Sequence, residues 1–184
     1  PRQSEFDMRR LPTSLWETLL PYQKEGVQDM VCRFDGRCLL GDEMGLGKTL
    51  QAIAVALYYD KFPLLIICPS YLRYNWKNEL LKWTSIRDED IQVMLTSKDE
   101  PHAKCNIISY DLCPRDPMKI TLEKKRFDTV ICDESHYIKS MKAKRTKAVV
   151  PLLRRASVAL CLTGTPLANR PVEAYTQCAA VRPC

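Results

Sequence analysis

The 184-residue chain predicts an α/β fold in which helices cover both faces of a parallel sheet. Three observations lead to this fold class. Six short runs of four or five residues are almost wholly apolar, which is typical of strands buried on both faces. Helical patterns stand between several of these runs, and the connections are short. Alternating strands and helices with short loops indicate a parallel sheet with right-handed crossovers.

The expected strands are spread along the chain between residues 37 and 162. Each has too little polar alternation for a sheet that exposes one face to water. No internal repeat or low-complexity segment interrupts the series, and the least regular stretch, 97–105, is expected to be a surface loop. The expected strands are 37–40, 64–68, 91–95, 106–109, 129–132 and 158–162.

Helical patterns are clearest in three places. Residues 48–58 are rich in Ala and Leu, and Pro171 suits the first turn of a last helix that runs to Ala180. A stripe of large apolar residues recurs every three or four positions, which predicts a helix with one buried face and assigns its two tryptophans to the core rather than to base stacking. The stripe consists of Leu72, Trp76, Leu80 and Trp83.

Length and composition indicate a single globular domain. Of the 184 residues, 46% are hydrophobic and 27% are charged, which is ordinary for such a domain. No apolar run approaches the roughly 18 residues that a membrane span needs, so no membrane partner is expected. The net charge of +6 mildly favours a polyanionic partner.

The nine cysteines do not predict a zinc site, because no two have C-x-x-C spacing and the two histidines are far apart. Cys68, Cys132 and Cys161 lie in expected buried strands. This placement indicates reduced cysteines used as small core residues. A reducing compartment, the cytosol or the nucleus, follows from it.

The stretch "GDEMGLGKTLQ" (41–51) nearly matches the phosphate-binding pattern G-x-x-x-x-G-K-[ST], with Asp42 in the first position, where Asp tolerates the turn. It joins an expected strand to an expected helix, so that backbone N–H groups and the helix N-terminus could surround a phosphate. Lys48 can reach the β- and γ-phosphates, and the Thr49 hydroxyl can hold Mg²⁺. A helix start that contains Gly-Lys-Thr by chance is the alternative. The candidate nucleotide-binding residues of this stretch are Asp42, Glu43, Met44, Gly45, Leu46, Gly47, Lys48 and Thr49.

Two further expected strands end in polar residues, and ligands bind at the carboxyl ends of parallel strands. "FDTVICDESH" (127–136) provides Asp133, which can hold Mg²⁺ directly or through water, and Glu134, which can orient and deprotonate an attacking water. "VALCLTGTP" (158–166) follows the same design. Acidic helix caps and a simple turn are the alternatives for the two segments. The residues suited to sensing a γ-phosphate, or to relaying it, are His136, Thr163, Gly164 and Thr165.

Taken together, "DEMGLGKT", "DESH" and "LTGTP" resemble motifs I, II and III of superfamily-two helicase-like ATPases, and more narrowly the SWI/SNF-related branch, where Asp42 is usual. "LLPYQKEGV" (19–27) resembles the Q motif, which implies Gln23 on the adenine. "LLIICPSYLRYNW" (64–76) resembles motif Ia. The sequences of the segments "IQVMLTSKD", "NIISYDL" and "EAYTQCAAVRP" are most similar to those of the annealing-helicase (HARP) branch.

The resemblance implies a RecA-like lobe at 19–184 after a lead-in at 1–18, with catalytic roles for Lys48, Asp133 and Glu134. It further implies ATP and Mg²⁺ as cofactors, DNA as a partner through its backbone at forks or single/double-strand junctions, and a nuclear location. A second RecA-like lobe in cis is implied as well, since no Q-x-x-G-R-x-x-R-like segment occurs here. A catalytically silent binding lobe, a nucleosome remodeller and another class of RecA-like ATPase remain the alternative functions.

DNA contacts are expected in two segments. Motif Ia segments contact the DNA backbone in this family, which implies such a role for Ser70, Arg73 and Asn75, whose side chains suit phosphate contacts without base reading. A basic run after the Asp-Glu pair either contacts DNA or forms a solvated helix face. It consists of Lys139, Lys142, Lys144, Arg145 and Lys147.

Overall fold

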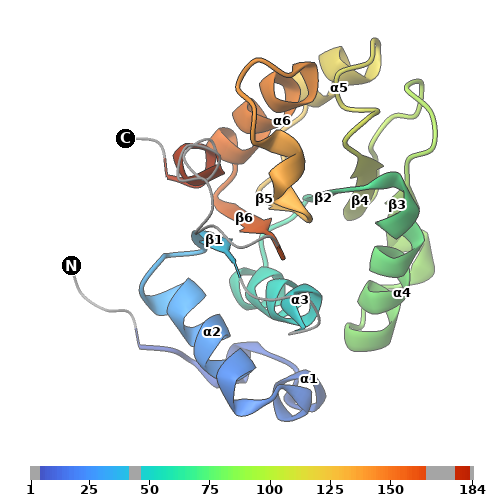
Figure 1. Ribbon diagram of the computed structural model, residues 1–184. Helices are drawn as coiled ribbons and strands as arrows, with labels where there is room; N and C mark the ends of the chain where they lie inside the picture. Colours follow the sequence, from blue (N-terminus) through green and yellow to red (C-terminus); the bar gives the residue numbers. More distant parts are fainter. Residues whose placement is uncertain (1–4, 42–46, 165–176, 183–184) are drawn as a thin grey trace.

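The computed structural model describes residues 5–41, 47–164 and 177–182. Its centre is a six-stranded sheet in which every pairing is parallel, in the order β1-β6-β5-β2-β4-β3 (Figure 1). All six expected strands are confirmed, with small differences at their ends. The strands are β1 (Arg37–Leu40), β2 (Leu64–Cys68), β3 (Ile91–Val93), β4 (Cys105–Ser109), β5 (Thr129–Cys132) and β6 (Val158–Leu162).

Six α-helices and four 3-10 turns in the described residues precede residue 163 and surround the sheet. The α-helices are α1 (Thr13–Thr18), α2 (Pro21–Cys32), α3 (Lys48–Tyr59), α4 (Arg73–Trp83), α5 (Met118–Lys124) and α6 (Lys144–Arg155). The 3-10 turns are η1 (Met8–Arg10), η2 (Ser70–Leu72), η3 (Asp88–Asp90) and η4 (Ser135–Ile138). The helices expected at 48–58 and from the Leu72 stripe are therefore confirmed as α3 and α4. Residues 177–181 are helical, while the expected start of that helix at Pro171 lies outside the described residues.

The sheet separates two hydrophobic cores, because successive side chains of a strand point to opposite faces. Helices α2, α3 and α4 cover one face, and α5 and α6 cover the other (Figure 1). In β2, Leu64 and Ile66 belong to the first core, whereas Leu65 and Ile67 belong to the second. Burial on both faces is the reason why the strands read as continuous apolar runs.

The region after β3 differs from the expected strand 91–95. Met94 still donates its N–H to the carbonyl of Ile107 at 2.8 Å, but the chain then turns away. The Asp99 carboxylate accepts the N–H groups of Leu95 at 2.7 Å and Thr96 at 2.9 Å, which replaces the sheet pairing. These hydrogen bonds also lower the pKa of Asp99. Strand β3 therefore ends two residues earlier than the apolar letters predict.

The expected surface loop 97–105 is only partly exposed. Pro101 and Ala103 are buried, and the last residue of the stretch, Cys105, begins β4. The buried side chain of Asn106 accepts the Ala103 N–H at 3.2 Å and donates to the Ala103 carbonyl at 2.9 Å. The amide thus satisfies a backbone turn that would otherwise be buried without partners.

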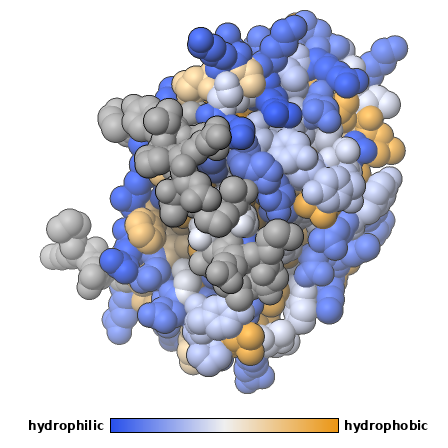
Figure 2. Space-filling model, in the orientation of Figure 1, coloured by the Kyte–Doolittle hydropathy of each residue, from blue (hydrophilic) through white to orange (hydrophobic). Residues whose placement is uncertain are grey.

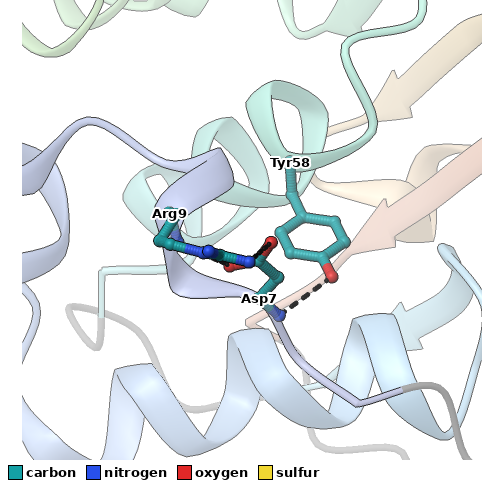
Figure 3. Close-up of polar contacts among 3 residues, drawn as sticks. All are labelled: Asp7, Arg9 and Tyr58. Carbon is teal, nitrogen blue, oxygen red and sulfur yellow. Dashed lines mark hydrogen bonds and ion pairs between the residues drawn. The ribbon is translucent and has the colours of Figure 1, made fainter.

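The segment before Leu19 packs on α3. The ring of Phe6 stacks on Tyr58 with centroids 5.0 Å apart. The Asp7 N–H also donates to the Tyr58 hydroxyl, at 3.2 Å, and Figure 3 shows this contact. Leu11 and Leu15 are buried in the core formed by α2 and α3. The described part of the lead-in is thereby built into the same hydrophobic core as the sheet.

The outer surface is mainly polar. Figure 2 shows that hydrophilic side chains dominate the described part of this face, with apolar ones in small separate groups. Among the helices of the described residues, none combines the length and the apolar character needed to cross a bilayer. Cys68, Cys132 and Cys161 are buried free thiols, as the sequence predicts, and burial raises the pKa of Cys68 to about 12.

Candidate nucleotide-binding site

Three neighbouring strands bring the predicted motifs together. Because β1, β6 and β5 are adjacent and parallel, their carboxyl ends lie side by side at one edge of the sheet. Lys48 follows β1, Asp133 follows β5, and Thr163 follows β6. Thr163 extends the pairing by donating its N–H to the Leu40 carbonyl at 3.0 Å. The candidate residues Asp42, Glu43, Met44, Gly45, Leu46 and Thr165 lie outside the described residues.

Gly47 and Lys48 form the start of α3. Gly47 has φ 72° and ψ 35°, a left-handed conformation that favours glycine. A Cβ at this position would lie 2.1 Å from Nε2 of Gln23, so the position also requires a residue without a side chain. Lys48 and Thr49 are the first two residues of α3, at its N-terminus.

Gln23 joins the start of α2 to this glycine. Its side chain is buried at 7% exposure, and Oε1 accepts the Leu20 N–H at 2.9 Å across the first turn of α2. The other end of the amide lies against Gly47. The predicted Q-motif glutamine is therefore in contact with the end of the phosphate-loop sequence.

Asp133 is held by a hydrogen bond at each of its four polar atoms. Its N–H donates to the Ile67 carbonyl at 2.8 Å, and its carbonyl accepts the Tyr110 hydroxyl at 2.6 Å. Of the carboxylate oxygens, Oδ1 accepts the Glu134 N–H at 2.8 Å and Oδ2 accepts the indole N–H of Trp76 at 2.9 Å. The carboxylate direction is thereby fixed before any ligand binds.

Two groups of effects change the pKa of Asp133 in opposite directions. Burial raises the pKa of this carboxyl above its usual value, because a charge is disfavoured away from water. The hydrogen bonds from Trp76 and from the Glu134 N–H lower the same pKa. The charge of Lys48 also lowers this pKa. A cation bound here would relieve the remaining cost of burial.

Glu134 adopts an uncommon backbone conformation, with φ 49° and ψ 50°. Its Oε2 lies 3.3 Å from Nδ1 of His136, two residues later in η4. The Tyr137 ring stacks on Tyr110 with centroids 5.1 Å apart, which holds the turn from the other side. The left-handed conformation of Glu134 turns the chain sharply between Asp133, directly after β5, and His136 in η4.

Motif II is also tied to the end of the described chain. The Ser135 hydroxyl donates to Oε1 of Gln177, and both side chains are buried. Arg37 donates to the carbonyls of Leu153 at 2.9 Å and Val181 at 2.7 Å, which fastens residues 177–181 beside β1. The stretch that resembles the close of the first lobe therefore contacts the Asp-Glu turn directly.

The three candidate DNA residues lie around the start of α4. Ser70 and Asn75 are exposed, whereas Arg73 is half-buried. The Arg73 guanidinium donates from Nε to the Ser70 carbonyl at 3.1 Å and from Nη1 to the Met94 carbonyl at 2.8 Å. With five N–H donors, a guanidinium can make these bonds and a further contact. Its DNA role stays a prediction.

The basic run after motif II is mostly exposed, in the turn that follows η4 and in the first half of α6. Arg145 is the half-buried member, and its guanidinium lies 5.1 Å from the centre of the Tyr137 ring. The exposed members are Lys139, Lys142, Lys144 and Lys147. Their exposure is compatible with both alternatives, a DNA contact and a solvated helix face.

The residues at this edge fit a Mg²⁺ ion that is shared with a nucleotide. Thr49 and Asp133 provide oxygen ligands, which Mg²⁺ prefers, and Mg²⁺ usually takes only one or two carboxylates together with phosphates and water. Within residues 5–41, 47–164 and 177–182, no group of three or more His, Cys, Asp or Glu side chains could form a metal site from protein alone. Such a small donor set suits a metal that arrives with a phosphate.

Two residues contribute to this site in ways that the sequence does not predict. Trp76 was expected in the core and is fully buried there, but its indole N–H also contacts the motif II carboxylate. Tyr110 is buried, and its hydroxyl reaches the backbone of Asp133. One property of the sequence could have indicated these contacts: a Trp or Tyr that is buried usually requires a hydrogen-bond partner for its N–H or O–H.

Comparisons with known proteins support the same identification. The family model of the SNF2-related domain matches residues 22–183. The SWI/SNF-related matrix-associated actin-dependent regulator of chromatin subfamily A-like protein 1 of Xenopus tropicalis is 44% identical over 182 residues, covering 97% of this chain and 19% of the relative. The DNA annealing helicase and endonuclease ZRANB3 of Mus musculus is 43% identical over 180 residues, covering 94% and 17%.

A solved structure has the same arrangement of strands and helices. The Sulfolobus solfataricus SWI2/SNF2 ATPase core in complex with dsDNA aligns with a TM-score of 0.78 and 30% identity, over 90% of this chain and 36% of that chain. The chain thus spans less than a fifth of the two curated relatives, at 19% and 17% of their lengths. The chain belongs to the SNF2-related domain family, and its parallel sheet has the RecA-like fold of SNF2 ATPase cores.

Proposed function

We propose that this chain is the ATP-binding lobe of a DNA-dependent ATPase that remodels or reanneals DNA. The observation that carries the proposal is the meeting of Lys48, Asp133 and Thr163 at the ends of three adjacent strands. Two relatives support the substrate class: one is named a DNA annealing helicase, and the archaeal ATPase core was solved with dsDNA. The nuclear location rests on the same relatives, one of which is named a regulator of chromatin.

In this proposal, the nucleotide is ATP and its phosphates lie at the N-terminus of α3. The helix N-terminus favours the negative charge, and Lys48 adds a positive charge at the β- and γ-phosphates. Thr49 and Asp133 would hold Mg²⁺, which when bound neutralises charge on the transferred phosphoryl group. Glu134 accepts the proton of the attacking water, and His136 contacts its carboxylate. Thr163 and Gly164, after β6, sense the γ-phosphate.

Base recognition is assigned to Gln23. Its amide carries both a donor and an acceptor, which matches the edge of adenine. The same side chain contacts Gly47, so occupation of the base site and the position of the phosphate loop are physically linked.

The proposed partners are DNA and a second RecA-like lobe. Ser70, Arg73 and Asn75 would contact DNA phosphates without reading bases. The second lobe would provide an arginine that completes the charge around the γ-phosphate, and such a residue is typically worth about 10³–10⁵ in rate. One lobe leaves that side of the nucleotide in water.

A steady-state ATPase assay tests the proposal. The 184-residue chain is measured alone, and joined to or mixed with the second lobe of a relative, each with and without forked DNA. We expect hardly any turnover and no DNA stimulation from the chain alone, and both when the second lobe is present. Robust DNA-stimulated turnover by the chain alone would refute the two-lobe mechanism. Nucleotide binding without turnover in every arm would indicate a silent binding lobe.

A further inference from the structure

The indole of Trp76 connects α4 to the carboxylate at the end of β5. Trp76 has 0% exposure, so no water can accept its N–H, and the partner is Oδ2 of Asp133, 57 positions away in the sequence. Asp133 itself is 9% exposed. A hydrogen bond to a charged, buried acceptor is among the stronger ones in proteins, and its loss would leave the carboxylate oxygen unsatisfied.

The other contacts of Asp133 do not replace this bond. Ile67 and Tyr110 hold the backbone of the residue, and the Glu134 N–H binds Oδ1. The indole N–H of Trp76 acts on Oδ2, the carboxylate oxygen that the Glu134 N–H does not bind. The rotation of the carboxylate about its last bond is thus set from α4.

We propose that Trp76 is a positioning residue that orients the Asp133 carboxylate for Mg²⁺. This inference rests on the proposed function, since it assigns the metal to Asp133. Partners that orient metal ligands typically contribute about 10- to 100-fold in metal affinity, because the ligand no longer needs to be ordered on binding. Trp76 acts only through Asp133 and does not touch the nucleotide in this proposal.

A purely structural role for Trp76 leads to a different expectation. If the indole only fills the core, its replacement would weaken the fold and would lower nucleotide affinity with and without Mg²⁺ alike. If the indole orients the carboxylate, the loss would appear only when Mg²⁺ is present. The Mg²⁺ dependence of nucleotide binding therefore separates the two roles.

The chain offers a matched control on the same helix. Trp83 also donates its indole N–H to a carboxylate, Oε2 of Glu79, at 2.9 Å. Trp83→Phe removes the same atoms and the same type of bond as Trp76→Phe, but seven positions away along α4 from the Asp133 contact. Asp133→Asn serves as the reference for loss of the metal ligand.

The experiment titrates a fluorescent ADP analogue onto the 184-residue chain and its variants over a range of Mg²⁺ concentrations. For Trp76→Phe we expect the Mg²⁺ concentration at half-maximal binding to rise about 10-fold or more, with Mg²⁺-free affinity unchanged. Trp83→Phe should follow the wild type. An unchanged Mg²⁺ curve for Trp76→Phe, beside a shifted one for Asp133→Asn, would overturn the inference and leave the proposed function intact. Mg²⁺-independent binding by the wild type would instead overturn the metal assignment itself.

A spectroscopic measurement decides the matter if Trp76→Phe does not fold. The wild-type chain has three tryptophans, so a ¹⁵N-labelled sample gives three indole N–H signals, from Trp16, Trp76 and Trp83. Addition of Mg²⁺ to the nucleotide-bound chain should shift the Trp76 signal and leave the Trp83 signal in place. A Trp76 signal that does not respond to Mg²⁺ would contradict the proposal.

Discussion

Replacement of Gly47 by alanine should reveal the contact between α2 and the phosphate-loop sequence. Gly47 has φ 72°, and an added Cβ would lie 2.1 Å from Nε2 of Gln23, well inside contact distance. The variant therefore faces two separate costs. The backbone must remain left-handed, and the buried amide of Gln23 must move away.

The size of each cost follows from its cause. A left-handed conformation costs a residue with a Cβ roughly 1–2 kcal/mol. Displacement of Gln23 breaks the bond from the Leu20 N–H, which is worth about 1 kcal/mol. Gly47→Ala should therefore lower the free energy of unfolding by about 2–3 kcal/mol, or roughly 4–12 °C in Tm for a domain of this size.

A double-mutant cycle separates the two costs. In the Gln23→Ala background the amide is gone, so Gly47→Ala should show only the backbone cost, and the pair should couple by about 1 kcal/mol. Gly36→Ala is the matched control, because Gly36 has φ 69° and its Cβ would meet Tyr59 rather than Gln23. The cost of Gly36→Ala should not depend on Gln23.

The measurement is urea unfolding of the wild type, the single variants and the two double variants. Additive costs for Gly47→Ala and Gln23→Ala would refute the predicted contact between the two positions. Coupling of equal size in the Gly36 pair would show that the effect is a general response to a weakened α2. Nucleotide affinity provides a second readout, which should fall in Gly47→Ala and persist in folded Gly36→Ala.

Four further substitutions test separate parts of the site. Lys48→Ala should abolish nucleotide binding while the chain still folds, with at most a small loss in Tm, because the variant loses a charge that favours the buried Asp133 carboxylate; wild-type affinity would contradict the assignment. Glu134→Gln, in a two-lobed protein, should bind ATP normally and reduce turnover by at least about 10²-fold, as expected for loss of a general base; normal hydrolysis would place the base elsewhere. Gln23→Ala should raise KM for ATP more than for GTP, and equal changes would exclude adenine recognition. Arg73→Ala should flatten the salt dependence of DNA binding by about one unit of slope, whereas Lys82→Ala, at the far end of α4, should not.

The strands could be predicted because each is buried on both faces. In β2 every residue from Leu64 to Cys68 is buried, so the sequence of this strand is an uninterrupted apolar run. The order of the strands could not be predicted, because it depends on where each crossover returns to the sheet. For helix α6 the sequence leaves two readings of the basic run open, a helix face and a DNA contact. Four of the first five residues of α6 are polar or charged, so they form no apolar stripe, and Pro151 lies inside the helix.

For the site, the sequence predicts which residues gather at the sheet edge, but not the contacts between their side chains. Motif spacing identified Lys48, at the start of the helix after β1, and Asp133, directly after β5, because parallel strands end at a common edge. The indole of Trp76 could not be connected to Asp133 in this way. Its periodic spacing indicates only a buried face of α4, while the partner of its N–H directly follows β5, 57 positions later in the sequence.

Two local costs occur at the same turn, and their position is informative. Burial raises the pKa of Asp133, which means that the folded chain keeps a carboxylate where its charge is disfavoured. The next residue, Glu134, is in a left-handed conformation that few side chains adopt. Such costs persist where the surroundings determine the conformation, and Trp76, Tyr110 and the Ile67 carbonyl do so here. A turn that served only to connect β5 with α6 would need neither the buried charge nor the strained residue. A bound Mg²⁺ would compensate the first cost, and the second turns the chain directly after Asp133, so the two costs together support the proposed nucleotide site at this turn.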